Sequence, residues 1–188
     1  MSNGGFERMS KLYTKVSMLV LDGKRNADDV SEVLQRILEK VSFLIYTDYQ
    51  RVNYDRSVVD LLVAGKYDRK NDQITDKNFR SIETGEKKVK FGVFRFTGKI
   101  IGSGDVITRM KAEGFRPAKL KELLAFSEKN PGLQSKFYII ALGSIADLFS
   151  GRRVVEIGKD EGGHTANLVS FNEENGWHDK YCFLGVRK

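Results

Sequence analysis

Two histidines, a tryptophan and two acidic residues near the C-terminus are the side chains best suited to binding chemistry. His164 follows Asp160 and Glu161 in a Gly-rich turn, and His178 stands directly after the single tryptophan, Trp177. Imidazole and carboxylate groups ligate many divalent metals. The spacing of these residues matches no metal signature, so we interpret both histidines as residues of surface turns. The sequence predicts no metal and no cofactor, and these five residues are candidates for ligand binding. For Trp177, packing over the end of a sheet is an equal alternative.

Cys182 is the only cysteine, which excludes an intramolecular disulfide and a cysteine-based zinc site. A nucleophilic cysteine would need a base and an exposed, electropositive setting. Alternation along residues 181–186 instead places Cys182 on one face with Leu184 and Val186, the pattern of a core cysteine.

Two loop sequences are weaker candidates for ion binding. The acidic turns at residues 160–163 and 172–175 offer the oxygen ligands that calcium prefers, but neither follows the EF-hand pattern. An acidic turn without an ion is the alternative. Gly102, Ser103 and Gly104 precede a predicted helix and resemble a phosphate cradle, although an N-cap at Ser103 explains them equally well.

Basic residues in the middle of the chain suggest a second function. The net charge is +7, and residues 45–100 carry 12 basic and 8 acidic side chains. Phenylalanines alternate with lysine and arginine from residue 89 to 96, as on surfaces that bind single-stranded nucleic acid. A strand with one buried aromatic face and one solvated basic face would have the same pattern of residues. The candidate nucleic-acid residues are Lys87, Lys88, Lys90, Arg95 and Lys99.

The expected elements place these residues in an α+β fold. Apolar residues recur at helical spacing over residues 7–21 and 26–41, which predicts an N-terminal helical hairpin. A short helix is expected at 57–64, stopped by Gly65. Residues 89–96 read as a strand with a bulge around Gly92.

The C-terminal half reads as a mixed domain of short antiparallel strands with two flanking helices. Helices are predicted at 104–112 and after Pro117, and strands at 137–142, 153–157, 167–171 and 181–186. The expected organisation is a helical region over residues 1–65, a polar connecting segment over 66–88 and an α+β domain over 89–188.

The bulk composition favours a folded protein. The 188 residues are 40% hydrophobic and 11% aromatic, enough to build a core. No basic, apolar signal sequence and no stretch of about 18 apolar residues is present. We therefore expect a cytoplasmic protein without a membrane segment, and the apolar stripe of the N-terminal hairpin is a possible homodimer contact.

Four short segments in the C-terminal half follow one another in a recognisable order: Phe115-Arg116-Pro117-Ala118, Ala141-Leu142-Gly143-Ser144, Trp177 and Phe183-Leu184-Gly185-Val186-Arg187. Over residues 100–188 this order resembles that of the formylglycine-generating-enzyme and C-type-lectin-like superfamily. The enzymes of that group use a pair of cysteines, whereas this chain has Cys182 alone. The resemblance therefore implies a non-catalytic, lectin-like scaffold whose loops bind a ligand.

These observations favour a non-catalytic binding module over an enzyme. It would recognise a protein or small ligand through loops near residues 144–151, 158–166 and 172–180. The alternative is a nucleic-acid-associated protein that uses the basic segment 66–99. No nucleophile–base pair, metal motif or cofactor loop is visible, although a carboxylate-based activity would leave no such signature.

Overall fold

An eight-stranded mixed sheet organises the part of the chain that the computed structural model describes, residues 44–96, 101–171 and 176–187. The strands run in the order β1-β3-β8-β5-β6-β7-β2, and β4 pairs with β8 outside this path. The pairs β5–β8 and β2–β7 are parallel and the others antiparallel. The elements are β1 (Leu44–Asn53), α3 (Val58–Ala64), β2 (Arg69–Lys70), β3 (Glu86–Arg95), α4 (Ser103–Ala112), β4 (Phe115–Pro117), α5 (Leu120–Lys129), α6 (Pro131–Gln134), β5 (Tyr138–Leu148), β6 (Gly151–Asp160), β7 (Gly163–Ser170) and β8 (Tyr181–Arg187).

This mixed α and β composition confirms the predicted class, but the prediction of an antiparallel arrangement is wrong for the pairs β5–β8 and β2–β7, which are parallel. The expected helices at 57–64, at 104–112 and after Pro117 are present, and each predicted C-terminal strand is found, most of them longer than expected. The predicted N-terminal hairpin and its dimer contact lie outside the described residues.

The described residues belong to one compact unit, which spans residues 43–188. β1 and α3 fall in this unit because β1 pairs with β3 along nearly its whole length, from Leu44–Phe94 to Asn53–Glu86. The polar segment 66–88 therefore contains part of the sheet. A single-sequence pattern does not show which distant strand β1 will pair with.

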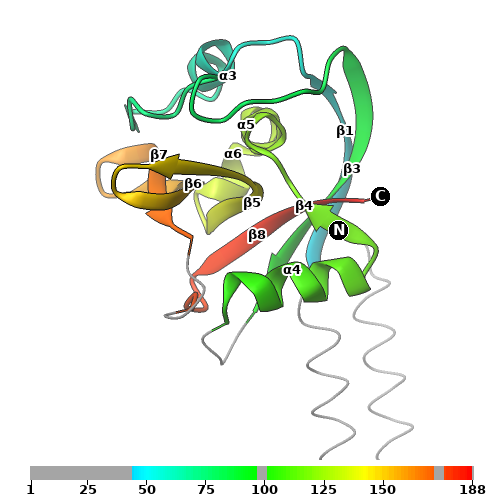
Figure 1. The fold of residues 1–188 in the computed structure, drawn as a ribbon. Coiled ribbons are helices and arrows are strands. Elements are labelled where there is room, and N and C mark those ends of the chain that lie inside the picture. The colour runs from blue at the N-terminus through cyan, green and yellow to red at the C-terminus, as the bar shows by residue number, and fades with distance from the viewer. Residues whose placement is uncertain (1–43, 97–100, 172–175, 188) are drawn as a thin grey trace, which may run out of the picture. The chain divides into compact units, whose positions relative to one another are not determined.

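Helices cover the sheet on both faces. In Figure 1, α5 and α6 lie on one side of the sheet with α3 beyond them, and α4 lies on the opposite side. Two separate apolar clusters correspond to these layers. One joins α3 and α5 to the sheet, and the other joins α4 to the opposite sheet face.

The central helix is α5, which is buried around most of its circumference. Leu120, Leu123 and Leu124 are buried as their spacing predicts, but Ala125 and Phe126 are buried as well. Sheet residues contact one side of α5 and α3 packs against it from another. The ring of Phe126 meets that of Phe91 on β3 edge-on at 5.3 Å.

The bulge predicted at Gly92 is wrong. Gly92 pairs in regular register with Thr47 on β1 and Gly185 on β8, and the register shift lies in β1 between Leu44 and Tyr46. The apparent break in alternation arises because both faces of β3 are buried in this part of the sheet. The packing requires a glycine at position 92, because a Cβ there would lie 2.7 Å from the ring of Phe115.

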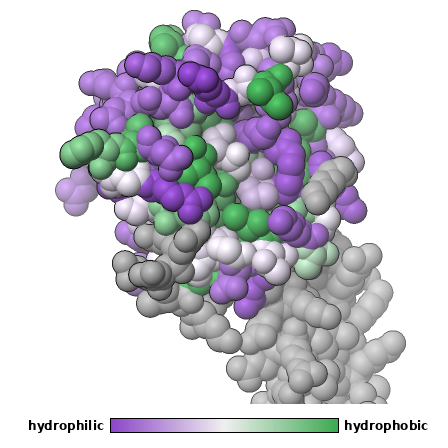
Figure 2. All heavy atoms as spheres, viewed as in Figure 1, coloured by the Kyte–Doolittle hydropathy of each residue, from purple (hydrophilic) through white to green (hydrophobic). Residues whose placement is uncertain are grey.

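The surface is largely hydrophilic. Figure 2 shows hydrophilic residues over most of the upper part of this face, around α3 and the loop that follows it, and apolar residues near its middle. Within the described ranges, no helix is long and apolar enough to cross a membrane.

The close approach of β5 to the entry of α5 generates a first prediction. Gly143 donates its backbone N–H to Ala118 O (2.9 Å), and a Cβ at this position would lie 2.6 Å from the backbone oxygens of Ala118 and Pro117. Gly143→Ala should therefore lower the free energy of unfolding by about 1–3 kcal/mol in urea denaturation. The control is Gly104→Ala in α4, where a Cβ meets no atom within 4 Å. This control should be neutral or stabilising by up to ~1 kcal/mol, and equal effects of the two changes would contradict the packing argument.

Candidate functional site

The acidic turn predicted to bind a ligand is occupied by interactions within the chain. Asp160 ends β6, where its Oδ1 accepts hydrogen bonds from Gly162 N and from the guanidinium of Arg69. These two donors lower the pKa of Asp160. Asp68 contacts β7, because its carboxylate accepts a hydrogen bond from the backbone N–H of His164 (2.7 Å). Both carboxylates therefore join the β6–β7 hairpin to β2, and Glu161 remains exposed at the tip.

Trp177 is not an exposed ligand anchor. Its side chain is only 1% exposed, its backbone pairs with that of Ile101, and its Nε1 donates to Ser103 Oγ (2.9 Å). The ring packs edge-on against Phe183 at 5.7 Å. This burial supports the alternative that the tryptophan packs at the sheet. It also explains why Ser103 does not cap α4, whose N-cap is Gly102.

The two histidines do not assemble a metal site. His178 is exposed, and His164 is partly buried on β7 with an Nδ1 atom that has no hydrogen-bond partner within the described residues. No group of three or more His, Cys, Asp or Glu side chains converges in the part of the chain that the structure describes.

The three predicted ligand loops do not form one surface. The β5–β6 turn lies at the Gly151 end of β6, and the β6–β7 turn lies at the Asp160 end. Residues 176–180 lead into β8, whose first residue, Tyr181, pairs with Tyr138 near that second end. Residues 172–175 lie outside the described ranges. The loops are thus divided between opposite ends of a strand that is ten residues long.

Cys182 is a core cysteine, as its alternation pattern predicts. It is fully buried in the same apolar cluster as Leu184 and Val186. Burial raises the pKa of its thiol to about 12, and Arg95 opposes this only in part. A thiol with such a pKa stays protonated at neutral pH and is a poor nucleophile.

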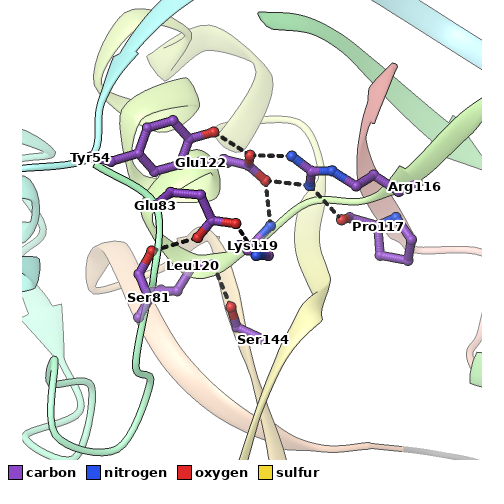
Figure 3. A network of polar contacts seen from close by, with 9 residues as sticks. All are labelled: Tyr54, Ser81, Glu83, Arg116, Pro117, Lys119, Leu120, Glu122 and Ser144. Atoms are coloured by element: carbon purple, nitrogen blue, oxygen red, sulfur yellow. Dashed lines mark hydrogen bonds and ion pairs between the residues drawn. The ribbon is translucent and has the colours of Figure 1, made fainter. Parts of the chain in front are cut away.

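Among the described residues, the carboxylate of Glu122 accepts the most side-chain hydrogen bonds, and the sequence interpretation did not assign it to a site. Its side chain is 0% exposed, and Figure 3 shows it at the centre of a network of donors. Tyr54 Oη donates to Oε1 (2.5 Å), and Arg116 donates to Oε2 (2.9 Å) and Oε1 (2.6 Å). The backbone N–H of Lys119 donates to Oε2 (2.7 Å). The Glu122 carboxylate therefore receives four hydrogen bonds, one for each of its usual lone-pair sites.

Neighbouring contacts extend this network to the loop before β3. Glu83 accepts from the ammonium of Lys119 and from Ser81 Oγ (2.8 Å). Burial alone would raise the pKa of Glu83, but these hydrogen bonds outweigh it and bring the pKa down to about 2. On the other side of Lys119, the backbone N–H of Leu120 donates to Ser144 Oγ on β5 (3.0 Å).

This network fits a structural clamp rather than a catalytic centre. Burial and the hydrogen bond to Glu122 raise the pKa of Tyr54 above its usual range, so its phenol stays neutral. Arg116 is held by the ion pair, which raises the pKa of its guanidinium. Glu122 stands three residues after the N-cap of α5, which is the position of a capping-box glutamate. The sequence does not signal this role, because the N-cap residue is Lys119 and not the serine or threonine of a capping box.

The residues of the predicted nucleic-acid set are divided between the two faces of β3. Lys88 and Lys90 share one face, whereas Lys87 lies on the other, with its ammonium 5.5 Å from the ring centre of Tyr54. Arg95 lies over the ring of Phe137 (5.3 Å) and donates to Asp179 O (3.2 Å). Lys99 lies outside the described residues.

Lys88 and Lys90 surround an exposed tyrosine from β1. Tyr49 is 57% exposed, and its ring centre lies 5.2 Å from the ammonium of Lys88 and 5.4 Å from that of Lys90. In the antiparallel register of β1 and β3, Tyr49 lies directly opposite Lys90, and Arg51 lies opposite Lys88. We call these four residues, Tyr49, Arg51, Lys88 and Lys90, the ribbon face. It carries three cations, of which Arg51 is paired with Glu86 (2.7 Å).

A hollow of about 370 Å³ lies beside the ribbon face, at the outer edge of β1. In the described residues β1 pairs with β3 alone, so this edge is the end of the sheet. The hollow is polar, with three cationic side chains and one carboxylate. Its lining residues are Asp48, Tyr49, Gln50, Arg51, Lys88, Lys129 and Asn130.

The chain matches no protein-family model, no curated protein and no solved structure.

The clamp generates a second prediction. All four hydrogen bonds to Glu122 come from donors on three residues, so a glutamine there would turn its own amide N–H groups toward other donors and leave Arg116 without its counter-charge. Glu122→Gln should lower the free energy of unfolding by about 3–5 kcal/mol, measured by urea denaturation. The control Glu128→Gln removes the partly exposed pair with Arg56 (2.7 Å) and should cost less than ~1 kcal/mol. Equal losses of unfolding free energy in the two variants would contradict the argument that the buried carboxylate of Glu122 stabilises the fold more than a partly exposed ion pair does.

A buried carboxyl on β6 generates a prediction of pH dependence. Glu156 is 6% exposed, and burial raises its pKa to about 7 against the opposing charge of Lys180. Between about pH 4.5 and 7 the folded chain therefore holds a proton that the unfolded chain has lost, so this group makes stability fall as pH rises.

Glu156→Gln removes that titration. Relative to the natural chain, the variant should gain on the order of 1–3 kcal/mol between pH 5 and pH 8, since one pKa unit corresponds to about 1.4 kcal/mol. Urea denaturation at the two pH values measures this difference. Glu161→Gln at the exposed turn is the control, and an identical pH response of both variants would refute the assignment.

Proposed function

We propose that this chain is a non-catalytic binding module whose ligand is a single-stranded nucleic acid, bound along the ribbon face. The observation that carries the proposal is the exposed ring of Tyr49 between two lysine ammonium groups. Proteins that bind single strands combine an aromatic stacking surface with cations that follow the phosphates. Tyr49 supplies a surface for a base, and Lys88, Lys90 and Arg51 supply the cations.

Solubility alone accounts for the lysines but not for the tyrosine. A strand face without a covering helix needs polar side chains, and lysine meets that need. An exposed aromatic ring adds no solubility, yet this ring lies at the centre of the cationic residues. The combination supports a ligand that has both a flat apolar part and a negative charge.

The resemblance to the C-type-lectin-like superfamily also implies a binding scaffold without catalysis, and we retain that as part of the proposal. The two readings agree on the class of function. They differ in the binding surface, which we place on β1 and β3 instead of on the C-terminal loops. The buried Trp177 and the division of those loops between opposite ends of β6 favour this change.

The proposal predicts salt-dependent binding that requires Tyr49. In fluorescence anisotropy with the full chain and a labelled single-stranded oligonucleotide, Tyr49→Ala should weaken binding roughly 5- to 100-fold, because stacking on one aromatic ring is worth about 1–3 kcal/mol. Three phosphate contacts should give a slope of about −2 for log affinity against log salt.

The matched control is Phe149→Ala, which removes a fully exposed aromatic ring at the β5–β6 turn. It should leave affinity unchanged, and circular dichroism should show both variants folded. Lys88→Gln and Lys90→Gln should each reduce the salt slope by roughly 0.7. Absence of binding at low salt, or equal losses from Tyr49→Ala and Phe149→Ala, would reject the proposed function.

A further inference from the structure

The hollow at the edge of β1 differs in chemistry from the ribbon face that it adjoins. Tyr49, Arg51 and Lys88 belong to both, while Lys129 at the end of α5 contributes to the hollow alone. A strand whose base stacks on Tyr49 would therefore have the hollow beside that base. The chemistry of the hollow decides which part of the strand fits there.

Most polar acceptors that line the hollow are already engaged within the protein. Asp48 accepts from the backbone N–H of Tyr49 (2.7 Å) and from Gln50 Nε2 (3.4 Å). Asn130 accepts from Tyr46 Oη (3.0 Å) and donates its own amide to Phe126 O (2.8 Å). Gln50 Oε1 has no hydrogen-bond partner within the described residues, but it is buried away from the surface of the hollow. The other bonds fix the wall of the hollow.

The cations that line the hollow retain donor capacity. Lys129 and Lys88 are exposed ammonium groups, and the guanidinium of Arg51 has five N–H donors, of which the bond to Glu86 uses one. Three cationic side chains against the one carboxylate of Asp48 leave the lining net positive, which favours an anion that carries more than one charge. A phosphate monoester carries about −1.5 to −2 at pH 7, whereas each internal phosphodiester of a strand carries one negative charge.

From these contacts we infer that the hollow holds the terminal phosphate monoester of the bound strand. This inference rests on the proposed function, because the strand is the ligand proposed for the ribbon face. The volume of about 370 Å³ is within the range of small-molecule sites and accommodates a terminal nucleotide phosphate with part of its sugar. The terminal base stacks on Tyr49, and Lys129 distinguishes an end with a phosphate from an end with a hydroxyl.

The experiment compares three labelled oligonucleotides of one sequence, with a 5′-phosphate, with a 3′-phosphate or with hydroxyls at both ends. Fluorescence anisotropy with the full chain should show one phosphorylated form bound roughly tenfold more tightly than the unphosphorylated form, as charge-assisted hydrogen bonds predict. The preferred form identifies which end of the strand enters the hollow.

Lys129→Gln should abolish that preference while leaving binding of the unphosphorylated strand within about twofold of the natural chain, since Lys129 lies outside the ribbon face. Lys159→Gln removes an equally exposed charge from β6 and should preserve the preference. Circular dichroism establishes that both variants are folded. Inorganic phosphate should reduce the preference before it reduces binding of the unphosphorylated strand.

The failures of the two proposals differ. Equal affinity for all three oligonucleotides, or a preference that survives Lys129→Gln, overturns the terminal-phosphate assignment and leaves the proposed function standing. No binding of any oligonucleotide rejects the proposed function, and the inference falls with it.

Discussion

The buried carboxylate of Glu122 requires a hydrogen-bond donor for each of its lone pairs. The segments that supply these donors determine how the elements around α5 are arranged. Arg116 comes from β4, Tyr54 from the segment between β1 and α3, and the Lys119 backbone from the entry of α5. A carboxylate without these partners would be strongly destabilising in the core. Satisfying it brings three separate segments of the chain to one point. The central helix then has a fixed start, against which β5 closes through the Gly143–Ala118 hydrogen bond.

Local patterns predicted the helices and the C-terminal strands, but they missed β1 and β2 and said nothing of strand pairing, for a physical reason. The leucines of α5 and the alternation around Cys182 report burial on a nearby face, which is a property of a few consecutive residues. The pairing of β1 with β3 depends on residues that are more than thirty positions apart, such as Arg51 and Lys88. The bulge expected at Gly92 fails for a related reason. Alternation of apolar and polar residues reveals a strand only when one of its faces is exposed to solvent. At Gly92, α4 and α5 bury both faces of β3.

The candidate site was predicted in part. Lys88 and Lys90 were identified from charge, but the exposed tyrosine between them comes from another strand. The residues that flank Tyr49 in the sequence form no motif that would mark it as a binding residue. Trp177 shows the opposite case. A lone tryptophan in a loop is a reasonable ligand anchor from sequence, yet the indole N–H finds Ser103, so that the whole side chain can be buried without an unsatisfied donor. The partner that decides its role lies 74 positions away.

One face of β3 passes from core to surface within a few residues, and the proposed binding surface is the part that this change leaves uncovered. Phe94 packs against Phe115 at 5.2 Å under the cover of α4, Gly92 makes room for Phe115, and Lys90 and Lys88 follow at the same spacing toward the other end of the strand. The covered part is aromatic because burial stabilises it, and the remaining part is cationic because water reaches it. Tyr49 is the exception, since an aromatic ring stands where the strand is already exposed. A surface that needed only to be soluble has no use for that ring, whereas a surface that stacks a base between two cations does.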